Sequence, residues 1–251
     1  MSQVSIRRIG RAAVLSLARP EAGNRITQVL AEELTAALEA ARRDPEVAGC
    51  VLTGEGSVFC LGGDYRGAGS RIAGRMEFGR AHLDLFDAMA RLGKPLVAAV
   101  NGHAHAGGFA LALSCDLMFL ADNATVGLPE AAHGLFPFLA LAVARNAMPK
   151  AIFFDLAYNA RLLNGHEACA LHLANEILPP NAVLPRAIEA VERTAHITPD
   201  VLTLGRDLYH ALSGLGAAEA LDQARFALGA ALSALDASRD QAEQEHRPRS
   251  S

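Results

Sequence analysis

The chain has 251 residues, of which 51% are hydrophobic and 20% are charged, and its formal net charge is −4. This length is enough to bury a large core, and without a basic face or a long apolar segment we expect no nucleic-acid partner, no membrane-spanning helix and no secretory signal. The four cysteines form no CxxC pair, which argues against a metal site and is typical of reduced thiols in a cytoplasmic protein.

Strand and helix patterns alternate over the first half of the chain. Residues 4–9 and 12–17 are β-like runs joined at Gly10, and residues 28–43 carry apolar residues at helical spacing behind Thr27 as N-cap. This alternation predicts an α/β domain with parallel strands. The other segments expected here are strands at 47–53, 96–100 and 117–121, a helix at 81–92, and an irregular Gly- and Arg-rich segment at 65–80.

From about residue 140 onward the sequence predicts helices almost throughout. The polar tail from Ser238 is expected to fray. We therefore expect a core of residues 1–190 and a helical C-terminal region of residues 191–251 that serves oligomerisation. The helical segments are expected at 147–162, 165–173, 184–195 and 198–235.

A turn with paired glycines, NGHAHAGGFAL at residues 101–111, lies between an apolar strand pattern and a helical pattern. Backbone N–H groups at the start of a helix carry partial positive charge and can hold a negatively charged atom. The turn contains no carboxylate, and only His103 and His105 could move a proton. The turn therefore predicts a binding element whose chemistry needs a residue from elsewhere.

Five stretches follow one another in the sequence: RPEAGNRIT (19–27), VLTGEGSVFCLGGD (51–64), KPLVAAVNGHAHAGGFALALSCDL (94–117), ATVGLPEAAHGLFP (124–137) and LNGHEACALHLANEIL (163–178). Together they resemble the crotonase superfamily, known from enoyl-CoA hydratases and isomerases. Any single stretch is weak evidence, but their common order and spacing is specific. The resemblance implies an α/β spiral of β-β-α repeats followed by a helical C-terminal region, assembled as a homotrimer or a dimer of trimers.

The resemblance also implies that the chain binds an acyl-CoA thioester and holds its carbonyl oxygen with two backbone N–H groups. By position in the motifs, these groups belong to Leu61 and Gly107. Fixed donors there stabilise the negative charge that grows on the oxygen as an enolate forms. No cofactor is implied beyond the CoA of the substrate. The residues expected near CoA are Ala22, Gly23, Leu61, Gly62, Gly63 and Asp64, the last of them as a structural residue that holds the loop.

Catalysis then depends on carboxylates. The family's two-glutamate hydratases carry one Glu three residues after the oxyanion-hole glycine, where this chain has Ala110, and a second Glu that is kept here as Glu130. Without the resemblance, Pro129-Glu130 is an ordinary helix start. One carboxylate can take a proton from C2 and return it at C4, so a Δ3-Δ2 enoyl-CoA isomerase with Glu130 as base is favoured.

Two alternatives stay open at this point. The chain could be a hydratase, a lyase or another enolate enzyme that recruits water, His105 or His133 as its second acid or base. It could also be a catalytically weakened acyl-CoA-binding protein, because Ala110 cannot move a proton. The acyl chain, the pathway and the oligomer number do not follow from the sequence.

Overall fold

The computed structural model describes residues 2–68 and 72–245, with side chains up to residue 236. The chain divides into two compact units, Met1–Thr194 and Ala195–Ser251. The boundary lies four residues beyond the expected one at residue 190.

Two β-sheets form the frame of the first unit within the part of the chain that the structure describes. A six-stranded sheet has the order β1-β2-β3-β5-β7-β10, and a four-stranded sheet has the order β4-β6-β8-β9. The strands are β1 (Val4–Ile9), β2 (Ala12–Leu17), β3 (Gly49–Gly54), β4 (Val58–Cys60), β5 (Leu96–Val100), β6 (His103–His105), β7 (Leu117–Ala121), β8 (Thr125–Gly127), β9 (Leu162–Asn164) and β10 (Glu176–Leu178).

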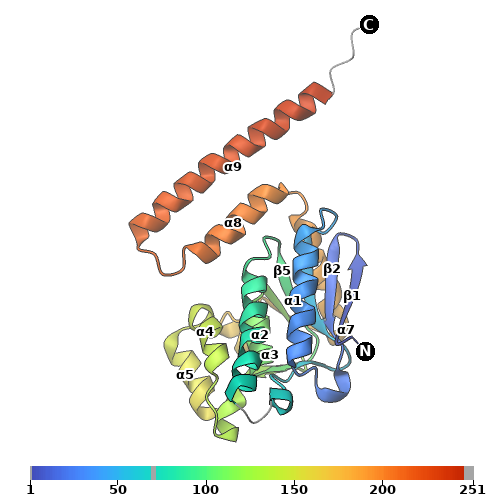
Figure 1. Cartoon of the computed structure of the whole chain (residues 1–251), viewed down its shortest axis with the longest axis vertical. Helices are drawn as coiled ribbons and strands as arrows, with labels where there is room; N and C mark the ends of the chain where they lie inside the picture. Colours follow the sequence, from blue (N-terminus) through green and yellow to red (C-terminus); the bar gives the residue numbers. More distant parts are fainter. Residues whose placement is uncertain (1, 69–71, 246–251) are drawn as a thin grey trace. The chain divides into compact units, whose positions relative to one another are not determined.

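Helices connect and cover these strands (Figure 1). None of the helices in the described residues has the length and apolarity to cross a membrane. Their bounds are α1 (Gln28–Arg43), α2 (Ile72–Ala90), α3 (Gly107–Leu113), α4 (Phe138–Ala147), α5 (Lys150–Asn159), α6 (Gly165–Ala170), α7 (Pro180–Thr194), α8 (Pro199–Ala211) and α9 (Ala217–Glu245), with 3-10 turns η1 (Pro20–Ala22), η2 (Tyr65–Ala68) and η3 (Pro129–His133).

The strands wind between the two sheets as a spiral. In each of the pairs β3/β4, β5/β6 and β7/β8, the first strand joins the large sheet and the second joins the small one. The neighbouring strands β2, β3, β5, β7 and β10 run parallel, and β1 pairs antiparallel with β2. The predicted α/β fold with parallel strands and β-β-α repeats is therefore confirmed.

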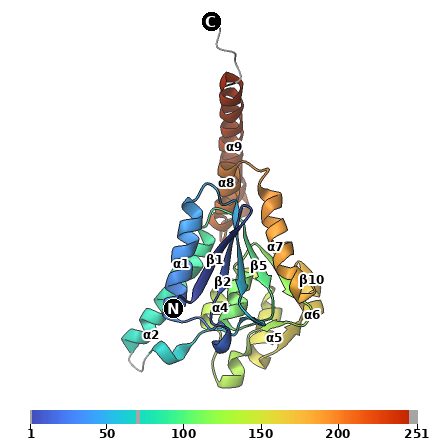
Figure 2. The same ribbon diagram turned by 90° about the vertical axis from the view of Figure 1, so that its right-hand side faces the viewer.

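Burial on both faces explains the apolar strands of the large sheet. Every residue of β2, β3 and β5 is buried, as expected for parallel strands with helices on both sides. In Figure 2, α1 and α2 lie on one face of this sheet and α7 on the other. Helix α1 has the predicted bounds, and the Thr27 hydroxyl accepts a hydrogen bond of 3.0 Å from the Leu30 N–H.

Several expected elements differ in the structure. The segment expected to be irregular up to residue 80 is helical from Ile72, because a face of α2 is buried despite its glycines. The helix expected at 147–162 begins at Lys150, behind Pro149, and the one expected at 198–235 is divided into α8 and α9. Two short strands, β9 and β10, interrupt the helical second half. The polar tail is helical as far as Glu245, and the residues after it lie outside the described chain.

Candidate active site

Three loops meet where three parallel strands of the small sheet end. Strand β6 pairs in parallel with β4 on one side and with β8 on the other. Their carboxyl ends therefore point to the same edge of the sheet. Residues 61–64 follow β4, residues 106–107 follow β6, and residues 128–130 follow β8. The strand order thus brings together three of the stretches on which the sequence analysis depended.

The loop after β4 corrects one expectation about the backbone donors. The Leu61 N–H donates a hydrogen bond of 3.0 Å to the Gly23 carbonyl, so it is already used. No backbone hydrogen bond of the described residues uses the N–H groups of Gly63 or Gly107. A Cβ atom built on Gly107 would lie 3.6 Å from the Gly63 nitrogen, so these two N–H groups are close together. The geometry favours Gly63 over Leu61 as the partner of Gly107.

Asp64 holds this loop in place. Its carboxylate accepts hydrogen bonds from Arg66 at 3.0 Å and from Arg19 at 3.3 Å, and its N–H donates to the Ile26 carbonyl at 2.8 Å. The hydrogen bond from Arg66, together with the one from Arg19, keeps the pKa of Asp64 below its ordinary value. The expected structural role of Asp64 therefore has a physical basis in its contacts.

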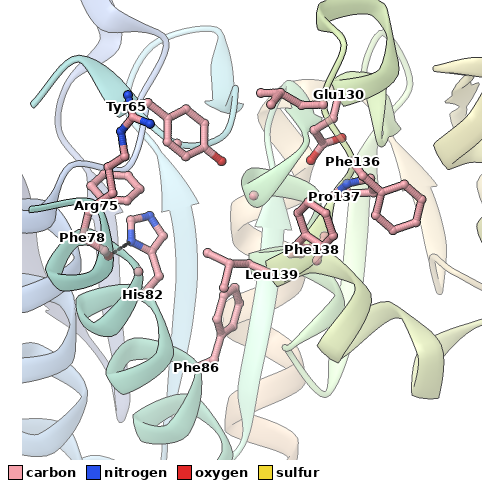
Figure 3. Close-up of a pocket in the computed structure, with 16 residues that line it drawn as sticks. Tyr65, Arg75, Phe78, His82, Phe86, Glu130, Phe136, Pro137, Phe138 and Leu139 are labelled. Carbon is pink, nitrogen blue, oxygen red and sulfur yellow. Dashed lines mark hydrogen bonds between the residues drawn. The ribbon is translucent and has the colours of Figure 1, made fainter. Parts of the chain in front are cut away.

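A pocket of about 550 Å³ opens beside these loops. Gly63, Gly107 and Glu130 lie on its strand-end side. Helix α2 supplies the opposite wall, and the segment 135–140 closes the pocket with aromatic and aliphatic side chains (Figure 3). Such a size and apolar lining suit an acyl group. The α2 residues on the wall are Arg75, Phe78, Gly79, His82 and Phe86.

Glu130 is the single carboxylate among the described residues that line the pocket. It lies in η3 behind Pro129, and its Oε2 atom is buried without a hydrogen-bond partner. Burial raises the pKa of Glu130 above its ordinary value. Ala110 lines the same pocket and is fully buried. The position that carries a second glutamate in the family's two-glutamate hydratases therefore faces the pocket with a methyl group in this chain.

Comparison with known proteins identifies the family. Residues 9–240 match the family model described as Enoyl-CoA hydratase/isomerase. A Thermus thermophilus protein provisionally named an enoyl-CoA hydratase is 37% identical over 212 residues, covering 82% of this chain and 83% of the relative. Carnitinyl-CoA dehydratase of Proteus mirabilis is 33% identical over 228 residues, covering 87% and 85%. The chain belongs to the enoyl-CoA hydratase/isomerase family.

The fold agrees with this membership. The crystal structure of an enoyl-CoA hydratase from Polaromonas sp. JS666 superposes with a TM-score of 0.85 at 25% identity, covering 91% of each chain. The resemblance to the crotonase superfamily is thereby confirmed. Membership of the enoyl-CoA hydratase/isomerase family implies an acyl-CoA substrate, and enzymes of this family typically need no cofactor.

The two histidines considered as a second acid or base do not line the pocket within the described residues. His105 Nε2 lies 2.9 Å from the Thr125 hydroxyl, and burial lowers the pKa of His105 to about 4. His133 is exposed at the end of η3. The geometry therefore favours neither residue as a partner of Glu130 in this family member.

The segments expected near CoA do lie together. Gly23 has a left-handed φ of 63°, which ends η1 and turns its carbonyl toward the Leu61 N–H. Gly62 has a φ of 93°, and a Cβ atom there would lie 2.8 Å from the Ala106 Cβ. Among the six residues expected near CoA, Gly63 lines the pocket.

The α2 wall was not predicted from the sequence. Phe78, His82 and Phe86 are spaced by four residues, which places them on one face of a helix. This spacing was the available signal, but the glycines indicated an irregular segment up to residue 80, so a helix was expected only at 81–92.

Proposed function

We propose that this family member is an enoyl-CoA isomerase that moves a double bond of its acyl group from C3 to C2. Glu130 acts as the single base, and the N–H groups of Gly63 and Gly107 hold the thioester oxygen. One observation carries the proposal: Glu130 is the single carboxylate on the described pocket wall, while Ala110 occupies the place of a second one.

The reaction consists of two proton transfers. The Glu130 carboxylate takes a proton from C2, and the electron pair of the broken C–H bond moves onto the thioester oxygen as an enolate forms. Gly63 and Gly107 donate hydrogen bonds to this oxygen, where the negative charge is larger than in the substrate. The protonated Glu130 then delivers the proton to C4, the double bond forms between C2 and C3, and the carbonyl is restored.

The environment of Glu130 supports this role. A base that must also return its proton works best when its pKa lies near the pH of the solution. Burial raises the pKa of Glu130 in that direction, and Phe136 with Phe138 lines the same pocket. The apolar wall also limits competing proton exchange with water.

The test is to supply a 3-enoyl-CoA and a 2-enoyl-CoA separately and to follow the products by mass and absorbance. Conversion of the 3-enoyl ester without gain of water is the expected result. Ala110→Glu is the informative variant because it restores a second carboxylate, and we expect it to gain hydration of the 2-enoyl ester. If both esters bind but neither reacts, the chain is an acyl-CoA-binding protein and the proposal is wrong.

A second candidate is hydration or dehydration of the acyl group. The names of the relatives favour it, since the Proteus mirabilis protein is a carnitinyl-CoA dehydratase. This reaction needs a second group that handles the water. Hydration of the 2-enoyl ester by the unmodified chain, at a rate above its isomerisation of the 3-enoyl ester, would establish this candidate instead.

For assembly, we propose a homotrimer or a dimer of trimers formed through the C-terminal unit. Support comes from apolar side chains that are exposed on α9, namely Leu221, Phe226, Leu228 and Leu232. Sedimentation velocity on the double variant Phe226→Asp/Leu228→Asp should show a smaller species than the wild type. A wild-type chain that sediments as a monomer would contradict this assembly.

A further inference from the structure

His82 is the most buried polar side chain of the pocket wall. The residue is 4% exposed and lies on α2 between Phe78 and Phe86 (Figure 3). Its Nδ1 atom lies 2.8 Å from the Phe78 carbonyl oxygen. A carbonyl oxygen only accepts hydrogen bonds, so Nδ1 must carry the proton. The other ring nitrogen, Nε2, then presents a lone pair.

No group of the described residues donates to this lone pair, and solvent does not reach Nε2. A buried acceptor without a donor is costly to leave unsatisfied. Burial also lowers the pKa of His82, so the ring is neutral at neutral pH and Nε2 remains an acceptor rather than a donor. His82 lines the pocket, so a molecule that enters the pocket is the source of a donor that the geometry offers.

The pocket joins the His82 side chain to the reaction site. Gly63, Gly107 and Glu130 line it at one side and His82 lines it at the other, among aromatic side chains. When Gly63 and Gly107 hold the thioester oxygen, the acyl chain has to run along the pocket wall that contains His82. In such apolar surroundings a hydrogen bond is stronger than in water. One hydrogen-bond donor on the acyl chain is therefore enough for His82 to distinguish that acyl chain from one without a donor.

We propose that His82 determines substrate specificity by accepting a hydrogen bond from a hydroxyl group on the acyl chain of the CoA ester. The inference rests on the proposed function in that the pocket holds the acyl group, and it adds a substrate class: hydroxylated rather than plain acyl chains. His82 takes no part in the proton transfers.

The test compares octanoyl-CoA with its derivatives that carry one hydroxyl group at C5, C6, C7 or C8, by calorimetric titration. These esters have no double bond, so they bind without isomerisation. At one position or more, we expect about fivefold to tenfold tighter binding than octanoyl-CoA. His82→Phe keeps an aromatic ring at this position and should abolish this gain, measured as the ratio of hydroxyl-ester affinity to octanoyl-CoA affinity within the same variant.

Phe86→Leu is the matched control, because it changes the shape of the same wall without changing Nε2. It should alter the affinities of plain and hydroxylated esters alike. A second measurement does not depend on a variant: the ¹⁵N chemical shift of His82 Nε2 should move on binding the preferred hydroxyl ester and stay unchanged on binding octanoyl-CoA.

The proposal is overturned if no hydroxyl position binds more tightly than octanoyl-CoA, as expected if Nε2 stays without a donor when the acyl chain is bound. It is also overturned if the gain persists in His82→Phe. Failure of the isomerase proposal would be seen separately, as absence of turnover of a 3-enoyl-CoA with these binding results intact.

Discussion

The two sides of the pocket are built in different ways. The strand-end side is made of backbone N–H groups and Glu130, held by parallel strands and by the loop that Asp64 anchors. The α2 side is made of side chains on one helical face. This difference indicates that the reaction and the choice of acyl group depend on different sides of the pocket. Changes on the first side should affect the rate for every substrate, and changes on the second should affect which substrate binds.

The largest effect is expected for Glu130→Gln. The amide cannot accept the C2 proton, so kcat for a 3-enoyl-CoA should fall by about 100- to 10,000-fold for every acyl chain. Steady-state kinetics measures this, with the exposed Glu46→Gln as control. An equal loss of kcat for all acyl chains supports the division of roles between the two sides of the pocket. A loss of kcat confined to certain acyl chains would contradict it.

Gly107→Ala should lower the rate by about 100- to 1000-fold while the protein still folds. The new Cβ meets its neighbours at ordinary contact distances, but it lies 3.6 Å from the Gly63 nitrogen, where the thioester oxygen has to bind. Gly108→Ala is the contrasting variant, because its Cβ would clash with the Cys60 carbonyl oxygen, so it should impair folding. Circular dichroism and kinetics distinguish the two. Full activity of Gly107→Ala would refute the assigned donors.

The pH dependence tests the state of Glu130. The base must be ionised, so kcat/KM should fall about tenfold per pH unit below the pKa of Glu130, which burial raises above its ordinary value of 4.5. The same raised pKa means that ionisation destabilises the fold as pH rises through it, and Glu130→Gln should remove this loss. Thermal unfolding from pH 4 to pH 8 measures both proteins. An acid limb at or below pH 4.5 would contradict burial as the cause.

On the α2 side, Phe86→Ala should change which acyl chains the protein prefers rather than the proton-transfer steps. The shorter side chain lengthens the pocket, so the ratio of kcat/KM for long over short acyl chains should rise by about tenfold. A series of 3-enoyl-CoA esters measures this ratio. If kcat instead falls equally for all esters, the two sides are not separable.

The smallest effect is expected on the free energy of unfolding, from a change at Ala106 on the strand-end side of the pocket. Ala106 has a φ of 54° and a ψ of −125°, a conformation that a side chain strains and glycine adopts freely. Ala106→Gly should therefore raise the free energy of unfolding by about 1 kcal/mol in urea titrations. Ala112→Gly, within α3, should lower it. A destabilised Ala106→Gly would mean that the turn is not strained.

The same comparison explains what could be predicted from sequence. The strand-end side follows strongly patterned strands, so the fold, Glu130 and Gly107 could be placed from motifs in order. Gly63 could not, because the choice between it and Leu61 depends on a hydrogen bond to Gly23, far away in the chain. A helix was predicted over residues 81–92, but the first half of α2, residues 72–80, was missed because its glycines disfavour a helix locally and packing of α2 against α1 overrides them. Strand β10 pairs with β7, so local sequence could not reveal it.

The central claim is that one carboxylate carries the proton from C2 to C4. The most direct measurement uses a 3-enoyl-CoA with deuterium at C2, turned over in ordinary water, with the product analysed by NMR. The single-base account predicts deuterium at C4 of the 2-enoyl product and its loss, together with turnover, in Glu130→Gln. A product formed at full rate with no deuterium at C4 from the earliest turnovers would contradict it.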